Sequence, residues 1–254
     1  MRRERIIYAA LTALLTLAMA ALLFPGFTVS MDEDIFWIKK THSTKKYQVV
    51  ILGDSRVYRG FSPEVAKEEL NGLQVLNFGY SSSGFPESYL NAAEARLTGD
   101  QQIILLGITP HSFTEKAWDN THFRSLQSLP REERIEKLYA GELLRIIPSL
   151  SPAGIRSHLR RQKRPSNYIQ RYEPGGWVAS DYRERDTGYA LASYASVFEQ
   201  NTFSMRHLEE LCRRIRHWSV NGIAVYAFRF PSTVSMEHLE DSLSGFKENI
   251  VRQQ

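Results

Sequence analysis

The chain has 254 residues, a formal net charge of +4 and one cysteine, Cys212. Its apolar fraction of 43% and charged fraction of 24% are typical of a folded globular protein and exclude a disordered chain. A single thiol excludes an internal disulfide and a cysteine-based metal site. Cys212 lies in an apolar-periodic run, residues 208–212, so it is expected to be buried on a helix. The mild charge and the lack of zinc-finger or RNA-binding signatures argue against a nucleic-acid partner. No motif indicates a cofactor or a metal ion.

Residues 1–26 are predicted to be a membrane anchor or signal segment. Three arginines precede an uncharged run, residues 6–24, that is close to the roughly twenty residues a membrane-spanning helix needs. Positive charge before the run predicts a cytoplasmic N-terminus, with the main domain extracytoplasmic, that is periplasmic or on the cell surface. Small residues at 18–20 leave a cleaved signal peptide as the alternative, but the apolar run continues beyond them, so we expect an uncleaved anchor.

Residues 27–46 are interpreted as a polar connector. Four lysines lie in its second half, directly before the first apolar run. We expect all four to lie on a solvated face: Lys39, Lys40, Lys45 and Lys46.

Strand-like and helical patterns alternate in the domain that follows, residues 47–254. Apolar runs rich in β-branched residues predict parallel strands at 47–52, 73–78, 102–106 and 223–228. Helices are expected at 63–70, 86–97, 204–220 and 236–251, the first with Ser62 as its N-cap and Pro63 at its first position. This alternation predicts an α/β fold with a doubly wound, flavodoxin-like, mostly parallel sheet and helices on both faces.

Residues 110–203 break this alternation and are interpreted as an insertion lying over the carboxyl edge of the sheet. A helix is expected at 131–147. The basic stretch 156–164 is either a solvated face or a contact with an anionic membrane surface. The insertion is rich in aromatic residues that either stack on sugar rings or pack locally: Tyr168, Tyr172, Trp177, Tyr182 and Tyr189.

Three predicted strands end in glycine-containing turns, at residues 53–55, 77–79 and 107–109. The carboxyl ends of parallel strands line the binding crevice of an open α/β sheet, so Ser55, Gly79 and Thr109 should converge. Ser55 precedes a helix, where backbone N–H groups favour an oxyanion. An exposed hydroxyl beside such donors suits acyl transfer. The alternative is a pure turn, in which Asp54 or Ser55 caps the helix.

These motifs resemble those of the SGNH/GDSL hydrolase family over residues 47–110, and by pattern alone over 204–231. The run 50–56, with its Gly-Asp-Ser-Arg, is similar to the first block of that family, Gly79 matches the second, and Thr109 falls where the third block has an Asn. The resemblance implies that Ser55 is the nucleophile and that the N–H groups of Ser55 and Gly79 form part of an oxyanion hole. The motifs are most similar to the cell-surface branch, which includes proteins that move acyl groups on cell-wall or exported polysaccharide.

The sequence departs from the family at two points. Thr109 is a shorter donor than the Asn it replaces. The Asp-x-x-His block expected after the last strand does not follow before Gln254, so we expect the C-terminal end of the domain to be incomplete. Two substitute bases are considered: His122, in Asp-Asn-Thr-His at 119–122, and His111, whose alternative is a partly exposed loop histidine. His238 is expected on a helix surface.

The leading hypothesis is an extracytoplasmic esterase or acyltransferase with an acyl ester or polysaccharide substrate. The alternative is a catalytically inactive, membrane-anchored SGNH-like protein that binds glycan or a membrane partner, or a truncated fragment. A nucleotide-binding flavodoxin-like domain is disfavoured, because neither a Gly-x-Gly-x-x-Gly nor a phosphate-binding Gly-Lys-Ser/Thr loop is present.

Overall fold

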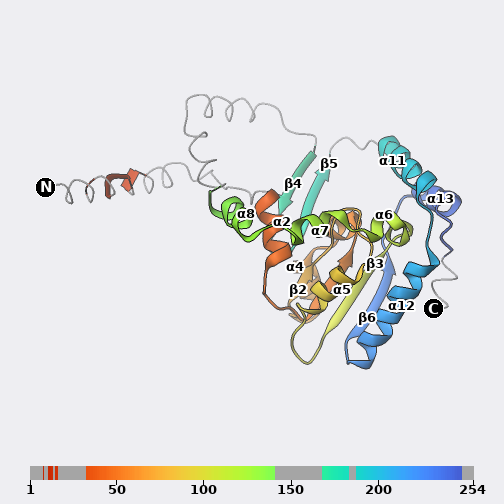
Figure 1. Ribbon diagram of the computed structural model, residues 1–254, viewed down its shortest axis with the longest axis horizontal. Helices are drawn as coiled ribbons and strands as arrows, with labels where there is room; N and C mark the ends of the chain where they lie inside the picture. Colours follow the sequence, from red (N-terminus) through yellow and green to blue (C-terminus); the bar gives the residue numbers. More distant parts are fainter. Residues whose placement is uncertain are drawn as a thin grey trace.

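The computed structural model describes residues 8, 11–13, 15–16, 33–140, 168–182 and 187–247 (Figure 1). The predicted anchor, residues 1–26, therefore lies almost entirely outside the described residues, as does the basic stretch 156–164. Within the described ranges, none of the helices has the length and apolar character needed to cross a membrane.

A parallel sheet of four strands, ordered β2-β1-β3-β6, forms the centre of the described structure. The strands are β1 (Val49–Gly53), β2 (Val75–Asn77), β3 (Ile103–Ile108) and β6 (Ala224–Arg229). Each forms close to its predicted position, which confirms the α/β fold and the parallel sheet. β1 lies between β2 and β3, and its residues 49–52 are completely buried. β6 pairs only with β3 among the described strands and is largely exposed.

The helices next to these strands also follow the sequence closely. α3 (Ser55–Gly60) and α4 (Pro63–Glu69) come after β1, and Ser62 caps α4 by accepting the Val65 N–H. α5 (Glu87–Glu94) connects β2 to β3, and α12 (Met205–Val220) precedes β6. Glu94 joins these two helices, because it accepts hydrogen bonds from Arg214 and from the Trp218 indole. Cys212 is buried on α12, as predicted.

Helix α2 (Glu33–His42) occupies much of the segment interpreted as a polar connector. It buries the apolar run 35–38, and Lys40 is only 6% exposed. The prediction of a solvated face was therefore wrong for Lys40, although Lys39, Lys45 and Lys46 are exposed. The ammonium group of Lys40 is accommodated because it donates to the carbonyls of Gly79, at 2.6 Å, and Gly176, at 2.8 Å.

Several short elements occupy the segment predicted as an insertion. They are η1 (Pro110–Phe113), α6 (Glu115–Trp118), α7 (Thr121–Gln127), α8 (Arg131–Ile135), a wider helical turn η2 (Glu136–Ala140), the strands β4 (Tyr168–Tyr172) and β5 (Val178–Tyr182), and α11 (Thr187–Gln200). The antiparallel β4–β5 hairpin was not predicted. It reaches α3, since Trp177 Nε1 donates to the Arg59 carbonyl at 2.8 Å. The helix expected at 131–147 is described only to residue 140.

Helix α13 (Val234–Leu243) is shorter than the predicted 236–251. The helix ends because Gly245 adopts the left-handed conformation, with φ of +73°, which is common just beyond a helix C-terminus. The Ser244 hydroxyl also donates to the Glu240 carbonyl in the last turn. His238 is exposed on α13, as expected.

Candidate active site

The three strand-end glycines surround one side chain, Val57, in the first turns of α3. A Cβ atom placed on Gly53 or on Gly107 would lie 2.3 Å from Val57 Cγ2, and one on Gly79 would lie 3.0 Å from Val57 Cγ1. Each of these positions must therefore be glycine for α3 to pack directly on the ends of β1, β2 and β3. This close packing places Ser55, the first residue of α3, at the carboxyl edge of the sheet.

Asp54 organises this edge. Its carboxylate is 1% exposed; Oδ1 accepts the Arg56 N–H at 2.9 Å and Oδ2 accepts the Thr109 hydroxyl at 2.9 Å. The capping role considered for Asp54 is therefore confirmed, and it leaves Ser55 half-buried. The Thr109 hydroxyl also lies 2.9 Å from the Ser112 hydroxyl. Since Thr109 gives its single proton to Asp54, Ser112 must donate to Thr109.

Gly79 lies where the sequence places it, but its backbone groups already have partners. Its N–H donates to Asn77 Oδ1 at 3.1 Å, and its carbonyl accepts from Lys40. The Asn77 amide in turn donates to the carbonyls of Val57 and Phe61 at 2.9 and 2.8 Å, which ties α3 to the end of β2. To serve as an oxyanion donor, the Gly79 N–H would have to leave Asn77.

Tyr194 of α11 is a site residue that sequence reasoning missed. Its phenol interacts with the side chains of Ser55 and Arg56, and the Arg56 guanidinium lies 5.3 Å from the centre of its ring. Burial raises the pKa of Tyr194, and Asp54 raises it further, so the phenol keeps its proton at neutral pH. No motif surrounds Tyr194 in the sequence, so only the docking of α11 at the sheet edge reveals it.

His111, one of the two substitute bases considered, is brought to the same edge. It belongs to η1, is 5% exposed, and its ring lies 6.3 Å from that of Tyr194, nearly perpendicular to it. The alternative of a partly exposed loop histidine is therefore wrong. Burial lowers the pKa of His111 below its ordinary 6.5, more than the neighbouring carboxylate of Asp54 raises it. The imidazole is consequently neutral at pH 7. Across the described residues, no hydrogen bond joins His111 to Ser55.

Glu240 of α13 is a second site residue that sequence reasoning missed. It is completely buried and paired with Arg56 and with Arg229, the latter at 2.9 Å. A buried carboxylate requires such partners, because desolvation of an unpaired charge is costly. The two pairs attach α13 to α3 and β6 and keep Arg56 beside Ser55.

His122 is not brought to this edge. Its Nδ1 accepts the Ser81 N–H at 3.3 Å, and its ring packs edge-on against Trp37 of α2, with centroids 4.6 Å apart. Asp119 of the same short motif is 65% exposed and lies 3.7 Å from Arg124. The Asp-x-x-His spacing at 119–122 therefore does not form an acid–base pair in this structure.

No metal centre accompanies these groups in the part of the chain that the structure describes, where no cluster of three or more His, Cys, Asp or Glu side chains could hold an ion. The chemistry available at the edge is that of a hydroxyl, a neutral imidazole, a phenol and a buried carboxylate.

Comparison with known proteins gives one distant likeness. No family model and no curated protein match the sequence. A solved structure from Streptococcus pneumonia, provisionally described as a platelet activating factor, is 22% identical, covers 48% of this chain and has a TM-score of 0.21. The match spans 56% of that protein, so about half of its length is represented here. A likeness this distant does not identify an activity.

Proposed function

We propose that this chain is a serine esterase or acyltransferase of the SGNH/GDSL type, built on a doubly wound sheet, with Ser55 as its nucleophile. One observation carries the proposal: a half-buried serine at the carboxyl end of β1 shares its surroundings with a buried carboxylate, a phenol and a neutral imidazole. Such a grouping at a strand end suits acyl transfer. The Gly-Asp-Ser-Arg motif supports the same assignment.

In the proposed reaction, Ser55 Oγ attacks the ester carbonyl and its proton passes to His111. A neutral imidazole can accept that proton and then protonate the departing alkoxide. Water or an acceptor hydroxyl then attacks the acyl-Ser55 carbonyl and gives its proton to His111. As the bond between the acyl group and Ser55 Oγ breaks, His111 passes that proton to Ser55 Oγ, which regenerates the free serine. In this proposal the Ser55 N–H and the Tyr194 phenol donate hydrogen bonds to the developing oxyanion. His111 must approach Ser55 when substrate binds, as catalytic hydrogen bonds commonly tighten in the complex.

The substrate and location proposed are those implied by the sequence. An acyl ester on cell-wall or exported polysaccharide suits the cell-surface branch that the motifs resemble. An extracytoplasmic domain on a single membrane anchor follows from the charge and apolar pattern of residues 1–26. Both depend on sequence alone.

A second candidate function is a non-catalytic SGNH-like protein that binds glycan or a membrane partner. The engaged Gly79 N–H favours it, because one expected oxyanion donor is already used within the fold. The committed Thr109 hydroxyl favours it as well.

Labelling with a fluorophosphonate probe separates the two candidates. We expect wild-type protein to label and Ser55→Ala to lose the signal, whereas Ser81→Ala, on the loop after β2, keeps it. His111→Asn should slow labelling by about 10²–10⁴-fold, the usual contribution of a general base. Wild-type labelling should fall with acid as His111 is protonated below pH 6.5. A folded wild-type protein that does not label would support the non-catalytic candidate instead.

A further inference from the structure

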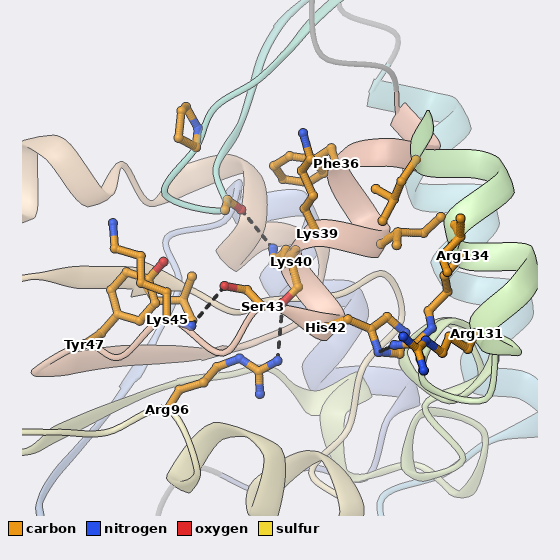
Figure 2. A pocket seen from close by; sticks show the side chains of 16 residues that line it. Phe36, Lys39, Lys40, His42, Ser43, Lys45, Tyr47, Arg96, Arg131 and Arg134 are labelled. Carbon is orange, nitrogen blue, oxygen red and sulfur yellow. Dashed lines mark hydrogen bonds between the residues drawn. The ribbon is translucent and has the colours of Figure 1, made fainter. Parts of the chain in front are cut away.

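A cavity lies away from Ser55, between α2, α8 and the turn of the β4–β5 hairpin (Figure 2). Its volume is about 780 Å³, large enough for a small-molecule ligand. None of the edge residues Ser55, His111 or Tyr194 lines it. The proposed acyl-transfer chemistry therefore does not use this space.

Among the residues that the structure describes, the lining of this cavity is rich in basic side chains and contains no carboxylate. Sixteen residues line it, and none is Asp or Glu. Six are Lys or Arg, contributed by α2, α8 and the loops around β1 and α5: Lys39, Lys40, Lys45, Arg96, Arg131 and Arg134. In Figure 2, Arg131 and Arg134 lie on one side of the cavity and Lys45 on the other, with Arg96 below.

The innermost cations have hydrogen-bond partners, but these partners are neutral. The Arg96 guanidinium donates to the carbonyls of Ala92 and Thr41, and its buried Nε has no partner. Arg134 Nη1 donates to His42 Nδ1 at 2.7 Å, and its Nε is likewise buried and unpartnered. Carbonyls and imidazole satisfy donors without cancelling charge, so the positive potential of the cavity persists.

Lys40 also lines the cavity, with its amino group held in place by surrounding carbonyls and rings. Its ammonium is bound by two backbone carbonyls and lies over four aromatic rings, at 4.9 Å from the ring of Trp37 and 5.1 Å from that of Tyr80. These contacts favour the charged form, whereas burial lowers the pKa of Lys40. An anion in the cavity would offset the cost of burying this group.

The same cavity has an apolar part. Phe36 and Leu76 are buried in its wall, while Ile135 of α8 is 47% exposed and Leu138 is half-buried. A simple inorganic anion would leave these groups in water. A ligand with a charged head and an apolar chain would contact both parts.

From this combination we propose that the cavity binds an anionic amphiphile, a phosphate monoester head carrying an acyl or prenyl-type chain. A phosphate brings up to two negative charges and several acceptors, which suits a cluster of guanidinium and ammonium groups. The head would lie near Arg96 and Arg134, with the chain along Phe36 and the exposed face of α8.

Calorimetric titration of the full-length protein tests this directly. The probes are dihexanoyl phosphatidic acid below its micelle concentration, inorganic phosphate and dihexanoyl phosphatidylcholine. We expect phosphatidic acid to bind at least tenfold more tightly than inorganic phosphate, because only it uses the apolar wall, and phosphatidylcholine to bind more weakly than phosphatidic acid. Binding should weaken as salt is added. Equal affinity for phosphatidic acid and inorganic phosphate would overturn the amphiphile proposal.

Two pairs of charge-removing variants localise the site. We expect phosphatidic acid binding to weaken at least tenfold in each of two double variants, Arg131→Gln/Arg134→Gln and Lys39→Gln/Lys45→Gln. The two lysines of the second variant are exposed, so their replacement spares the fold. The matched control, Arg213→Gln/Arg216→Gln on exposed positions of α12, removes the same charge elsewhere and should leave affinity unchanged. Equal weakening in the control would show non-specific attraction and overturn the proposal. Ser55→Ala should bind normally, so this result is independent of the acyl-transfer assignment.

Discussion

Asp54 connects the motif seen in the sequence to the geometry of the site. A Gly-Asp-Ser turn could have served only to start a helix, and Asp54 does cap α3. The same carboxylate also accepts from Thr109, at the end of β3, and so fixes the two strand ends relative to each other. The Thr109 side chain therefore faces Asp54.

Thr109→Val should destabilise the protein by about 1–3 kcal/mol, because it leaves the buried Asp54 and Ser112 each short of a hydrogen-bond partner. Urea unfolding followed by circular dichroism measures this. Thr109→Ser keeps the hydroxyl and should cost clearly less. If the Val variant were as stable as wild type, the carboxylate would not depend on this donor.

At the scale of elements, the contact between α3 and the sheet edge is the feature that positions Ser55. Gly107 packs its Cα against Val57, and a methyl group added there would also lie 3.3 Å from Phe230. A side chain at position 107 and the Val57 side chain would therefore occupy the same volume. We expect the effects of substitutions at these two positions on stability to be coupled.

Gly107→Ala alone should destabilise the protein by about 1–3 kcal/mol through overpacking. In a Val57→Ala background the added methyl group enters the space that is vacated, so the extra cost should largely disappear. A double-mutant cycle by urea unfolding measures this coupling. The distant Gly222→Ala, where nothing lies within 4 Å of an added Cβ, should combine additively with Val57→Ala. Additivity of Gly107→Ala with Val57→Ala would contradict the packing described.

The elements that could be predicted from the sequence are those whose pattern is local. Strands β1, β2 and β3 lie in short apolar runs with a glycine in or just after the end of each strand, and α4 carries its own cap. Helix α2 was missed because its apolar residues 35–38 are consecutive and flanked by charges, without helical periodicity. The β4–β5 hairpin was missed because its strands are five residues each and depend on contacts with α3, through Trp177 and the Arg59 carbonyl, and with α2, through Phe36 and Tyr172.

The site could be predicted only in part, for the same reason. Ser55, Thr109 and His111 follow strand ends, where parallel topology brings residues together. Tyr194 and Glu240 lie far along the chain, on helices whose docking no short pattern encodes. The burial of Lys40 could not be predicted from the sequence either, because the carbonyls that bind its ammonium belong to residues 79 and 176, far from it along the chain.

For the molecule as a whole, desolvated histidines contribute to the response to acid. Burial lowers the pKa values of His111 and His122 below 6.5. Between these lowered values and 6.5, the unfolded chain binds protons that the folded protein does not. The free energy of unfolding therefore increases with pH in this window. As the pH falls through the window, this part of the stability is lost. The loss is at most about 1.4 kcal/mol for each unit by which a histidine pKa is lowered.

Urea unfolding at about pH 7.5 and about pH 5.5, on either side of the ordinary histidine pKa, should show this loss. His122→Gln should reduce the difference between the two conditions, whereas His238→Gln, on the exposed face of α13, should leave it unchanged. A wild-type protein equally stable at both pH values would contradict the assignment of lowered pKa values to His111 and His122.

The position of β6 has a consequence for how the chain folds. β1, β2 and β3 all lie between residues 49 and 108, but β6 joins the sheet by pairing Ile103 with Ala224, across more than a hundred residues. Closing so long a loop costs conformational entropy before any contact is gained, and pairings distant in sequence slow folding. We therefore expect the three-stranded unit to form early and β6 to dock late. Until it docks, Glu240 has no Arg229 to pair with, so the surroundings of Ser55 are completed only in the final step of folding.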